Sequence, residues 1–209
     1  HHGIVNNILL QPERSSPDWY WQRNYIRGTT LYDEVLKQGK HVAALLWPVT
    51  AKSEITWNLP EIFANRRWTN QILTSAANGT VGYQLMLNHR FGRLRDGIRQ
   101  PALDNFVHAS LKYTLKTYRP DLTLVHFTDL DTQRHHYGVH SEEAAAAIKR
   151  HDERIGELMH LLHQNRMSVK RDTTVIILGD HSQLDVRNVI LINKLLREQG
   201  YLKVQNGRV

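Results

Sequence analysis

Residues 122–135 read LTLVHFTDLDTQRH, and this stretch decides the fold class. It opens with an apolar, β-rich run that is typical of a buried strand, and polar side chains follow where that strand ends. Upstream, residues 102–118 carry apolar side chains at helical spacing and stop before Pro120, so they predict a helix that leads into the strand. A helix that alternates with a strand is typical of an α/β protein.

The same alternation continues in both directions along the chain. Residues 30–39 predict a helix closed by a glycine, and residues 41–47 predict a buried strand that stops at Pro48. Downstream, a serine followed by two glutamates predicts the start of a long helix over residues 141–162. Residues 173–178 form a continuous β-branched run, which is typical of a strand buried on both faces.

We therefore expect one α/β domain over residues 1–209, with a sheet flanked by helices and without internal repeats. In the long helix, His151 and Asp152 interrupt the apolar stripe between Ile148 and Ile155. They are either hydrogen-bonded structural groups or functional ones, and the base rates for buried polar groups favour the structural role.

Composition limits the chemistry that such a domain can carry. The 209 residues contain no cysteine, which excludes disulfides and thiolate ligands and leaves histidine and carboxylate as metal donors. The net charge of +7 favours anionic partners. Its densest basic stretch, residues 90–99, lacks an aromatic platform, so we expect a solvated surface and no binding of nucleic-acid duplexes. No stretch approaches the roughly 20 apolar residues of a membrane helix.

Two short acid–histidine pairs are the clearest candidates for function. Asp131 and His135 are four residues apart, so a helical turn would place them on one face, and Asp180-His181 follows the run at 173–178. Alone, the first could be a surface ion pair and the second a capped turn. Because the carboxyl ends of strands meet at one edge of an open α/β sheet, we expect both pairs there, as a zinc-type centre.

The chain resembles the type I phosphodiesterase and nucleotide pyrophosphatase family, within the alkaline phosphatase superfamily. The resemblance covers nearly the whole chain, in the expected order. The matching stretches are residues 2–7 (HGIVNN), 46–48 (LWP), 120–138, 152–156 (DERIG) and 174–182 (TVIILGDHS).

The resemblance implies an alkaline-phosphatase-like sheet flanked by helices and a centre with two divalent ions, expected to be zinc. Asp131 and His135 would hold one ion, and Asp180 and His181 the other. Asn7 would contact the substrate phosphate. A threonine nucleophile would attack phosphorus and form a covalent nucleotidyl-enzyme, so the implied activity is hydrolysis of phosphodiester or pyrophosphate bonds in small, nucleotide-type substrates.

The threonine and one aspartate ligand implied by the resemblance would precede residue 1, and a last histidine ligand would follow Val209. We therefore expect the sequence to be an internal fragment, incomplete at both ends, with two protein ligands left for each ion. Such a fragment should bind zinc weakly or not at all and be inactive alone. Neither the compartment nor the oligomeric state is predicted.

Two other functions remain open at this stage. One is a phosphonate or phosphate monoester hydrolase of the same superfamily, and the other is a catalytically inactive binding or structural domain. Two residues also depart from the family pattern: Ser182 stands where glycine is usual, and His126 stands where many members have a tyrosine near the nucleoside.

Overall fold

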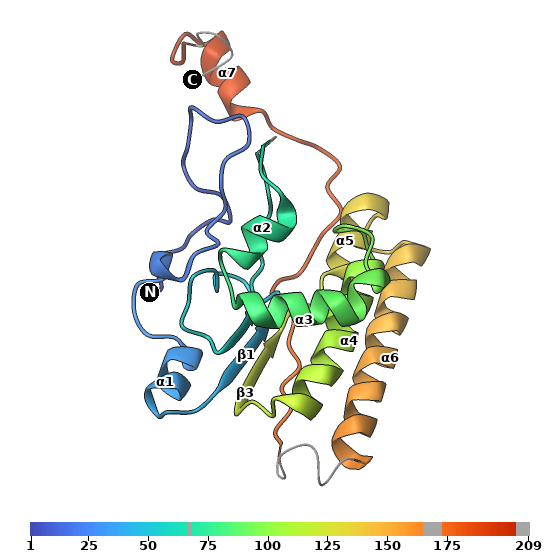
Figure 1. Ribbon diagram of the computed structural model, residues 1–209. Helices are drawn as coiled ribbons and strands as arrows, with labels where there is room; N and C mark the ends of the chain where they lie inside the picture. Colours follow the sequence, from blue (N-terminus) through green and yellow to red (C-terminus); the bar gives the residue numbers. More distant parts are fainter. Residues whose placement is uncertain (67, 165–172, 204–209) are drawn as a thin grey trace.

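The computed structural model of the chain describes residues 1–66, 68–164 and 173–203 (Figure 1). It is a mixed α/β structure in which helices flank a parallel sheet, as in an alkaline-phosphatase-like fold. The elements are η1 (Arg23–Tyr25), α1 (Leu31–Lys37), β1 (Val42–Leu45), β2 (Trp57–Leu59), α2 (Gln71–Ala76), α3 (Val81–Phe91), η2 (Gly92–Leu94), α4 (Ala102–Thr117), β3 (Leu122–Val125), α5 (Asp129–Tyr137), α6 (Glu142–Gln164) and α7 (Ile192–Glu198).

The sheet has the strand order β2-β1-β3, and β1 is parallel to both neighbours. Leu45, the last residue of β1, stands opposite Leu59 on one side and Val125 on the other. All three strands therefore end at the same level. The residues that follow them emerge together at one edge, which we call the carboxyl edge.

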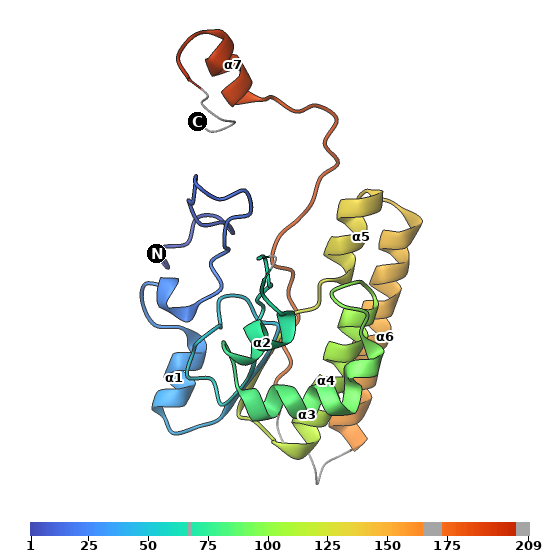
Figure 2. The same ribbon diagram turned by 45° about the horizontal axis from the view of Figure 1, so that its top comes forward.

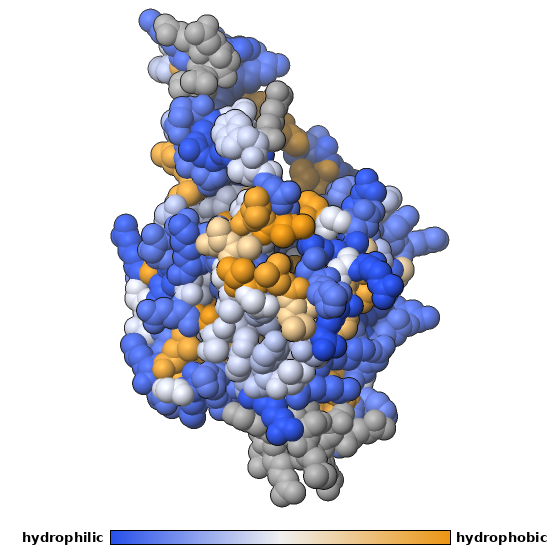
Figure 3. Space-filling model, in the orientation of Figure 1, coloured by the Kyte–Doolittle hydropathy of each residue, from blue (hydrophilic) through white to orange (hydrophobic). Residues whose placement is uncertain are grey.

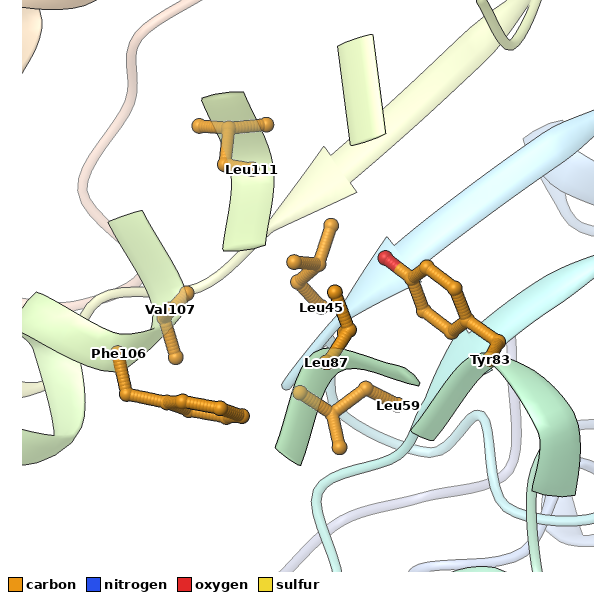
Figure 4. Close-up of a cluster of buried hydrophobic side chains, with 7 residues drawn as sticks. All are labelled: Leu45, Leu59, Tyr83, Leu87, Phe106, Val107 and Leu111. Carbon is orange, nitrogen blue, oxygen red and sulfur yellow. The ribbon is translucent and has the colours of Figure 1, made fainter. Parts of the chain in front are cut away.

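The main core covers one face of the sheet. It is formed by the ends of β1 and β2 together with the inward faces of α3 and α4, as Figure 4 shows. Its buried members are Leu45, Leu59, Tyr83, Leu87, Phe106, Val107 and Leu111. The opposite face packs against α1, where Tyr32 forms a second cluster with Val42 and Ala44. The alternation along β1 thus turns successive side chains to the two layers of helices.

The structure confirms the helices and strands predicted before residue 165, with ends shifted by a few residues. The helix predicted at 30–39 is α1. Thr30 and Asp33 form a capping box at its start, and Gly39 lies just beyond its end with φ +69°. The predicted strands at 41–47 and 122–127 are the shorter β1 and β3.

The strand predicted at residues 173–178 is wrong. In the described part of the chain, residues 173–191 contain no helix or strand, and the side chains of Ile176, Ile177 and Leu178 are 78%, 64% and 68% exposed. A β-branched run has a high strand propensity, but a strand forms only when a neighbouring strand satisfies its backbone. We call residues 173–191 the extended segment (orange in Figure 1).

Exposed apolar side chains gather in two places. The extended segment and α7 carry several, and Figure 2 shows α7 well away from the sheet. On the face seen in Figure 3, an apolar patch lies over α2 and α3, where the exposed large side chains are Ile72, Leu73, Val81, Leu85 and Met86. No helix of the described residues is long and apolar enough to cross a membrane.

Candidate functional site

The first acid–histidine pair lies on α5, which begins directly beyond the carboxyl edge of β3. Asp131 and His135 share one face of this helix, and His135 Nε2 is 3.3 Å from Asp131 Oδ1. The helix ends at Gly138, whose φ of +99° lets the chain reverse toward α6. The segment is helical, so the four-residue spacing does place both side chains on one face.

The second pair lies on the extended segment, not at the end of a strand. Asp180 Oδ1 accepts a hydrogen bond from the backbone N–H of the next residue, His181, at 2.9 Å. His181 Nε2 lies 3.4 Å from Asp180 Oδ2. Both side chains are more than half exposed.

The two pairs meet at Asp131. His181 Nε2 is 3.8 Å from Asp131 Oδ1, and the amide of Gln183 donates a hydrogen bond to the same oxygen at 3.1 Å. A second bond, from the Val139 N–H to Asp185 Oδ1 at 2.9 Å, joins the extended segment to the chain just after α5. The structure therefore brings the four predicted ligand residues together, although the expected second strand is not there to do it.

The distances within each pair suit a tetrahedral ion. Donor atoms about 2.0–2.2 Å from such an ion lie about 3.3–3.6 Å from one another. The separations of 3.3 Å between His135 and Asp131 and 3.4 Å between His181 and Asp180 fall in this range. Among the described residues, however, no group of three or more histidines and carboxylates is arranged to hold a metal ion. Each pair thus offers two donor atoms, fewer than a tetrahedral ion needs.

Asn7, the predicted phosphate contact, lies elsewhere in the described structure. Its backbone carbonyl accepts a hydrogen bond from the Tyr20 N–H at 2.9 Å, and its neighbour Ile8 forms a β-bridge with Trp19. In both ribbon views this N-terminal segment (blue) is separated from the extended segment (orange). Among the described residues, none of the hydrogen bonds found for Asn7 reaches the acid–histidine pairs.

A cavity of about 270 Å³ opens next to this N-terminal segment. Polar and charged side chains form more of its wall than aromatic ones do. The Nε1 of Trp21 is buried there without a hydrogen-bond partner among the described residues. The aromatic residues that line it are Trp19, Trp21, Tyr25 and Phe63.

Two further residues of the carboxyl edge face the acid–histidine pairs. His126 follows β3, and its Nε2 lies 3.9 Å from Asp180 Oδ2. Glu61 stands two residues beyond β2. Burial raises the pKa of the Glu61 carboxyl, the nearby His126 opposes the rise, and Asp180 and Asp131 add to it. Glu61 was not predicted as a site residue, because its place at the carboxyl edge follows from β2, a three-residue strand that the sequence pattern did not predict.

A buried network of charges, not predicted from the sequence, anchors the first turn of α5. Asp129 is fully buried, and its carboxylate accepts hydrogen bonds from Arg150 Nε at 2.7 Å and Nη2 at 3.0 Å. Arg154 Nη1 approaches the same carboxylate at 3.4 Å. Burial alone would raise the pKa of Asp129, but hydrogen bonds from Arg150 and Gln133 and the two guanidinium charges outweigh it and lower the pKa.

A second buried carboxylate, from α4, completes this network. Asp104 Oδ1 accepts the backbone N–H of Thr128 at 3.1 Å, and its Oδ2 accepts that of Asp129 at 3.0 Å. Gln100 Nε2 donates to Asp104 Oδ1 at 2.8 Å and to Thr128 Oγ1 at 2.7 Å. Two buried aspartates are thus balanced by Arg150 and Arg154. The sequence gives little indication of this role for Arg150 and Arg154, since arginines four apart on a helix are usually exposed.

The polar interruption predicted in the long helix proves to be structural at His151. Its ring packs against Phe127 at a centroid distance of 5.9 Å, and its Nε2 accepts the Leu130 N–H at 3.4 Å. Burial lowers the pKa of His151, although Asp104 and Asp129 oppose the shift. Asp152 is exposed.

The fold defines an α/β protein of the alkaline-phosphatase-like type, with one acid–histidine pair beyond β3 and a second pair brought beside it by the extended segment. The family model described as type I phosphodiesterase / nucleotide pyrophosphatase matches residues 1–208, and the chain belongs to this family. It is therefore of the phosphodiesterase and pyrophosphatase type of hydrolase. Comparison with curated proteins gives no match.

Proposed function

We propose that this protein hydrolyses phosphodiester or pyrophosphate bonds of small, nucleotide-type substrates with the help of two divalent ions, zinc by preference. Asp131 and His135 hold one ion, and Asp180 and His181 hold the other. The observation that carries the proposal is the approach of His181 to within 3.8 Å of Asp131, which places both pairs around one point. When bound, two such ions polarise a phosphoryl group and stabilise the attacking and leaving oxygens.

The chain's own residues orient the donors of this site. Gln183 donates to Asp131 Oδ1, the oxygen that also faces His135 and His181, and so holds this carboxylate in place. The backbone N–H of His181 holds Asp180 Oδ1 in the same way. Neutral imidazole is the ligand form of histidine, so His135 and His181 serve in their deprotonated state.

The substrate class draws support from the cavity that Trp19, Trp21, Tyr25 and Phe63 help to line. The cavity combines aromatic side chains with charged ones such as Asp18, Lys52 and Arg66, and ligand sites likewise pair apolar surface with polar groups that fix orientation. An aromatic wall suits a planar base or aryl group. The nucleophile in this proposal is the threonine that the resemblance implies. A phosphate contact by Asn7 would require the N-terminal segment to approach the acid–histidine pairs, from which it is separated in the structure.

The test compares the full-length protein with Asp131→Asn and His181→Ala variants on a bis-aryl phosphate and a mono-aryl phosphate. We expect each variant to lose about 100-fold or more in kcat on the diester, because each removes a charged or ligating group from the site. Asp96→Asn and His160→Ala are matched controls, since both side chains are exposed and lie outside the site.

The outcomes separate the alternatives. Turnover of the diester that a chelator abolishes and zinc restores supports the proposal. Preference for the monoester indicates a phosphate monoester hydrolase instead. Binding of a nucleotide without turnover indicates an inactive binding domain. Equal loss in the control variants contradicts the role given to the acid–histidine pairs.

A further inference from the structure

The helix that carries the first acid–histidine pair packs against α6 but buries few side chains of its own. It has nine residues, and of its described side chains only one is buried, that of Asp129. No apolar stripe therefore sets its rotation about its own axis. Thr128 at its start makes no capping hydrogen bond with its side chain among the described residues.

Groups from two other helices replace these missing contacts. The carboxylate of Asp104, on α4, accepts the first backbone N–H groups of α5, which have no partner within the helix. The guanidinium of Arg150, on α6, donates two parallel hydrogen bonds to the carboxylate of Asp129. A bidentate bond of this kind fixes direction as well as distance.

We propose that Arg150 is a positioning residue for the first acid–histidine pair: through Asp129, and with Asp104 holding the same turn from α4, it sets where Asp131 and His135 stand. The inference rests on the proposed function for its consequence in metal binding. Asp129 lies in the same turn as Asp131, so a shift or rotation of that turn displaces the pair as one body. Outer partners that orient metal ligands affect affinity without touching the ion.

A purely structural ion pair predicts a different result. In that case loss of Arg150 lowers the stability of the whole domain, because it leaves a buried carboxylate without its main partner. The helices would then open together, and the folded protein would keep its site unchanged. A positioning role predicts instead a local loosening of α5 in protein that remains folded.

The experiment compares Arg150→Gln, Arg150→Lys and the control Lys149→Gln in the full-length, metal-free protein. Lys149 is the exposed neighbour of Arg150 on the same helix. Backbone hydrogen exchange is followed in the peptides that span 129–137 and 102–117. We expect exchange in α5 to rise roughly tenfold in Arg150→Gln while α4 stays at the wild-type rate. Arg150→Lys keeps the charge but cannot form the bidentate bond, so its exchange rate in α5 should lie between those of the wild type and Arg150→Gln.

The second measurement is zinc affinity by competition with a chromophoric chelator, at a temperature where every variant is folded. We expect Arg150→Gln to bind zinc roughly tenfold more weakly, with partial rescue in Arg150→Lys. If Arg150→Gln does not fold, Arg150→Lys carries both measurements.

Unchanged exchange in α5, or an equal rise in α4 and α5, overturns the inference. So does unchanged zinc affinity in a variant whose α5 has loosened. If the wild type binds no zinc while α5 responds as expected, the anchoring of the helix stands and the proposed function fails. The two ideas are thus tested separately.

Discussion

Gln183 donates a hydrogen bond to Asp131 across 52 positions of the sequence, and the bond is 3.1 Å long. It links the extended segment to α5 at the oxygen that also faces both histidines of the candidate site. The position of the second pair relative to the first therefore depends on a neutral amide that is not itself a ligand.

We predict that Gln183→Ala weakens zinc binding about tenfold, because outer partners of metal ligands typically contribute 10–100-fold to affinity. Chelator competition on the full-length protein measures this change. Gln199→Ala, an exposed change outside the site, serves as control. Equal affinities in the two variants would show that Gln183 does not orient Asp131.

Removal of a core side chain from α3 should be costly only on its inward face. Leu87 is fully buried in the main core, whereas Leu85, two residues away, is 54% exposed. We expect Leu87→Ala to lower the free energy of unfolding by about 2–5 kcal/mol and Leu85→Ala by about 0.5 kcal/mol or less. Urea denaturation of both variants gives the comparison, and similar losses would contradict the packing shown in Figure 4.

The start of α1 should make stability depend on pH in the acid range. Asp33 accepts hydrogen bonds from the Thr30 backbone at 2.7 Å and hydroxyl at 2.8 Å, and it pairs with Arg23. Burial raises the pKa of Asp33, but its hydrogen bonds with Arg23 and Thr30 outweigh that effect and lower the pKa below its usual value.

A lowered pKa in the folded state means that the unfolded chain binds the proton more readily. The contribution of Asp33 is therefore complete above its ordinary pKa near 4 and is lost as the pH falls through the lower folded value. We expect Asp33→Asn to cost about 1 kcal/mol at neutral pH, and the difference from wild type to vanish in acid. Unfolding curves between neutral and acid pH test this, with Glu34→Gln as control. A difference that persists in strong acid would contradict the ion pair.

The absence of a strand at residues 173–178 also has a measurable consequence. Because Ile177 is 64% exposed, Ile177→Ser should change the free energy of unfolding by about 0.5 kcal/mol or less. Burial in a central strand would instead make this substitution cost several kcal/mol. Calorimetry of the variant against Ile177→Val distinguishes the two arrangements.

Sequence patterns predicted those elements whose pattern is strong and whose partners are local. Residues 102–118 show helical periodicity over several turns, and residues 42–47 are apolar throughout. Both α4 and β1 could therefore be predicted from the sequence. The short strand β2 was not predicted. Its central residue is Asn58, a polar side chain that is buried because its amide donates to the Thr50 carbonyl at 2.7 Å.

The candidate site was predictable in part for a geometric reason. Residues that follow parallel strands emerge at one edge, and this rule located α5 and its pair correctly. The same rule assigned the second pair to the end of a strand that the described chain does not form. Pairing between Asp129 and Arg150 could not be foreseen, since it depends on how three helices pack and leaves no regular spacing in the sequence.

The two halves of the site are fastened to the molecule in different ways. Asp131 and His135 are tied through buried charges to the helical layer formed by α4 and α6. Asp180 and His181 lie on the extended segment, which hydrogen bonds of the Gln183 amide and the Asp185 carboxylate join to α5 and to the turn beyond it. Both bonds come from side chains outside the hydrophobic clusters, so their loss would act on the second pair and leave the core packing in place.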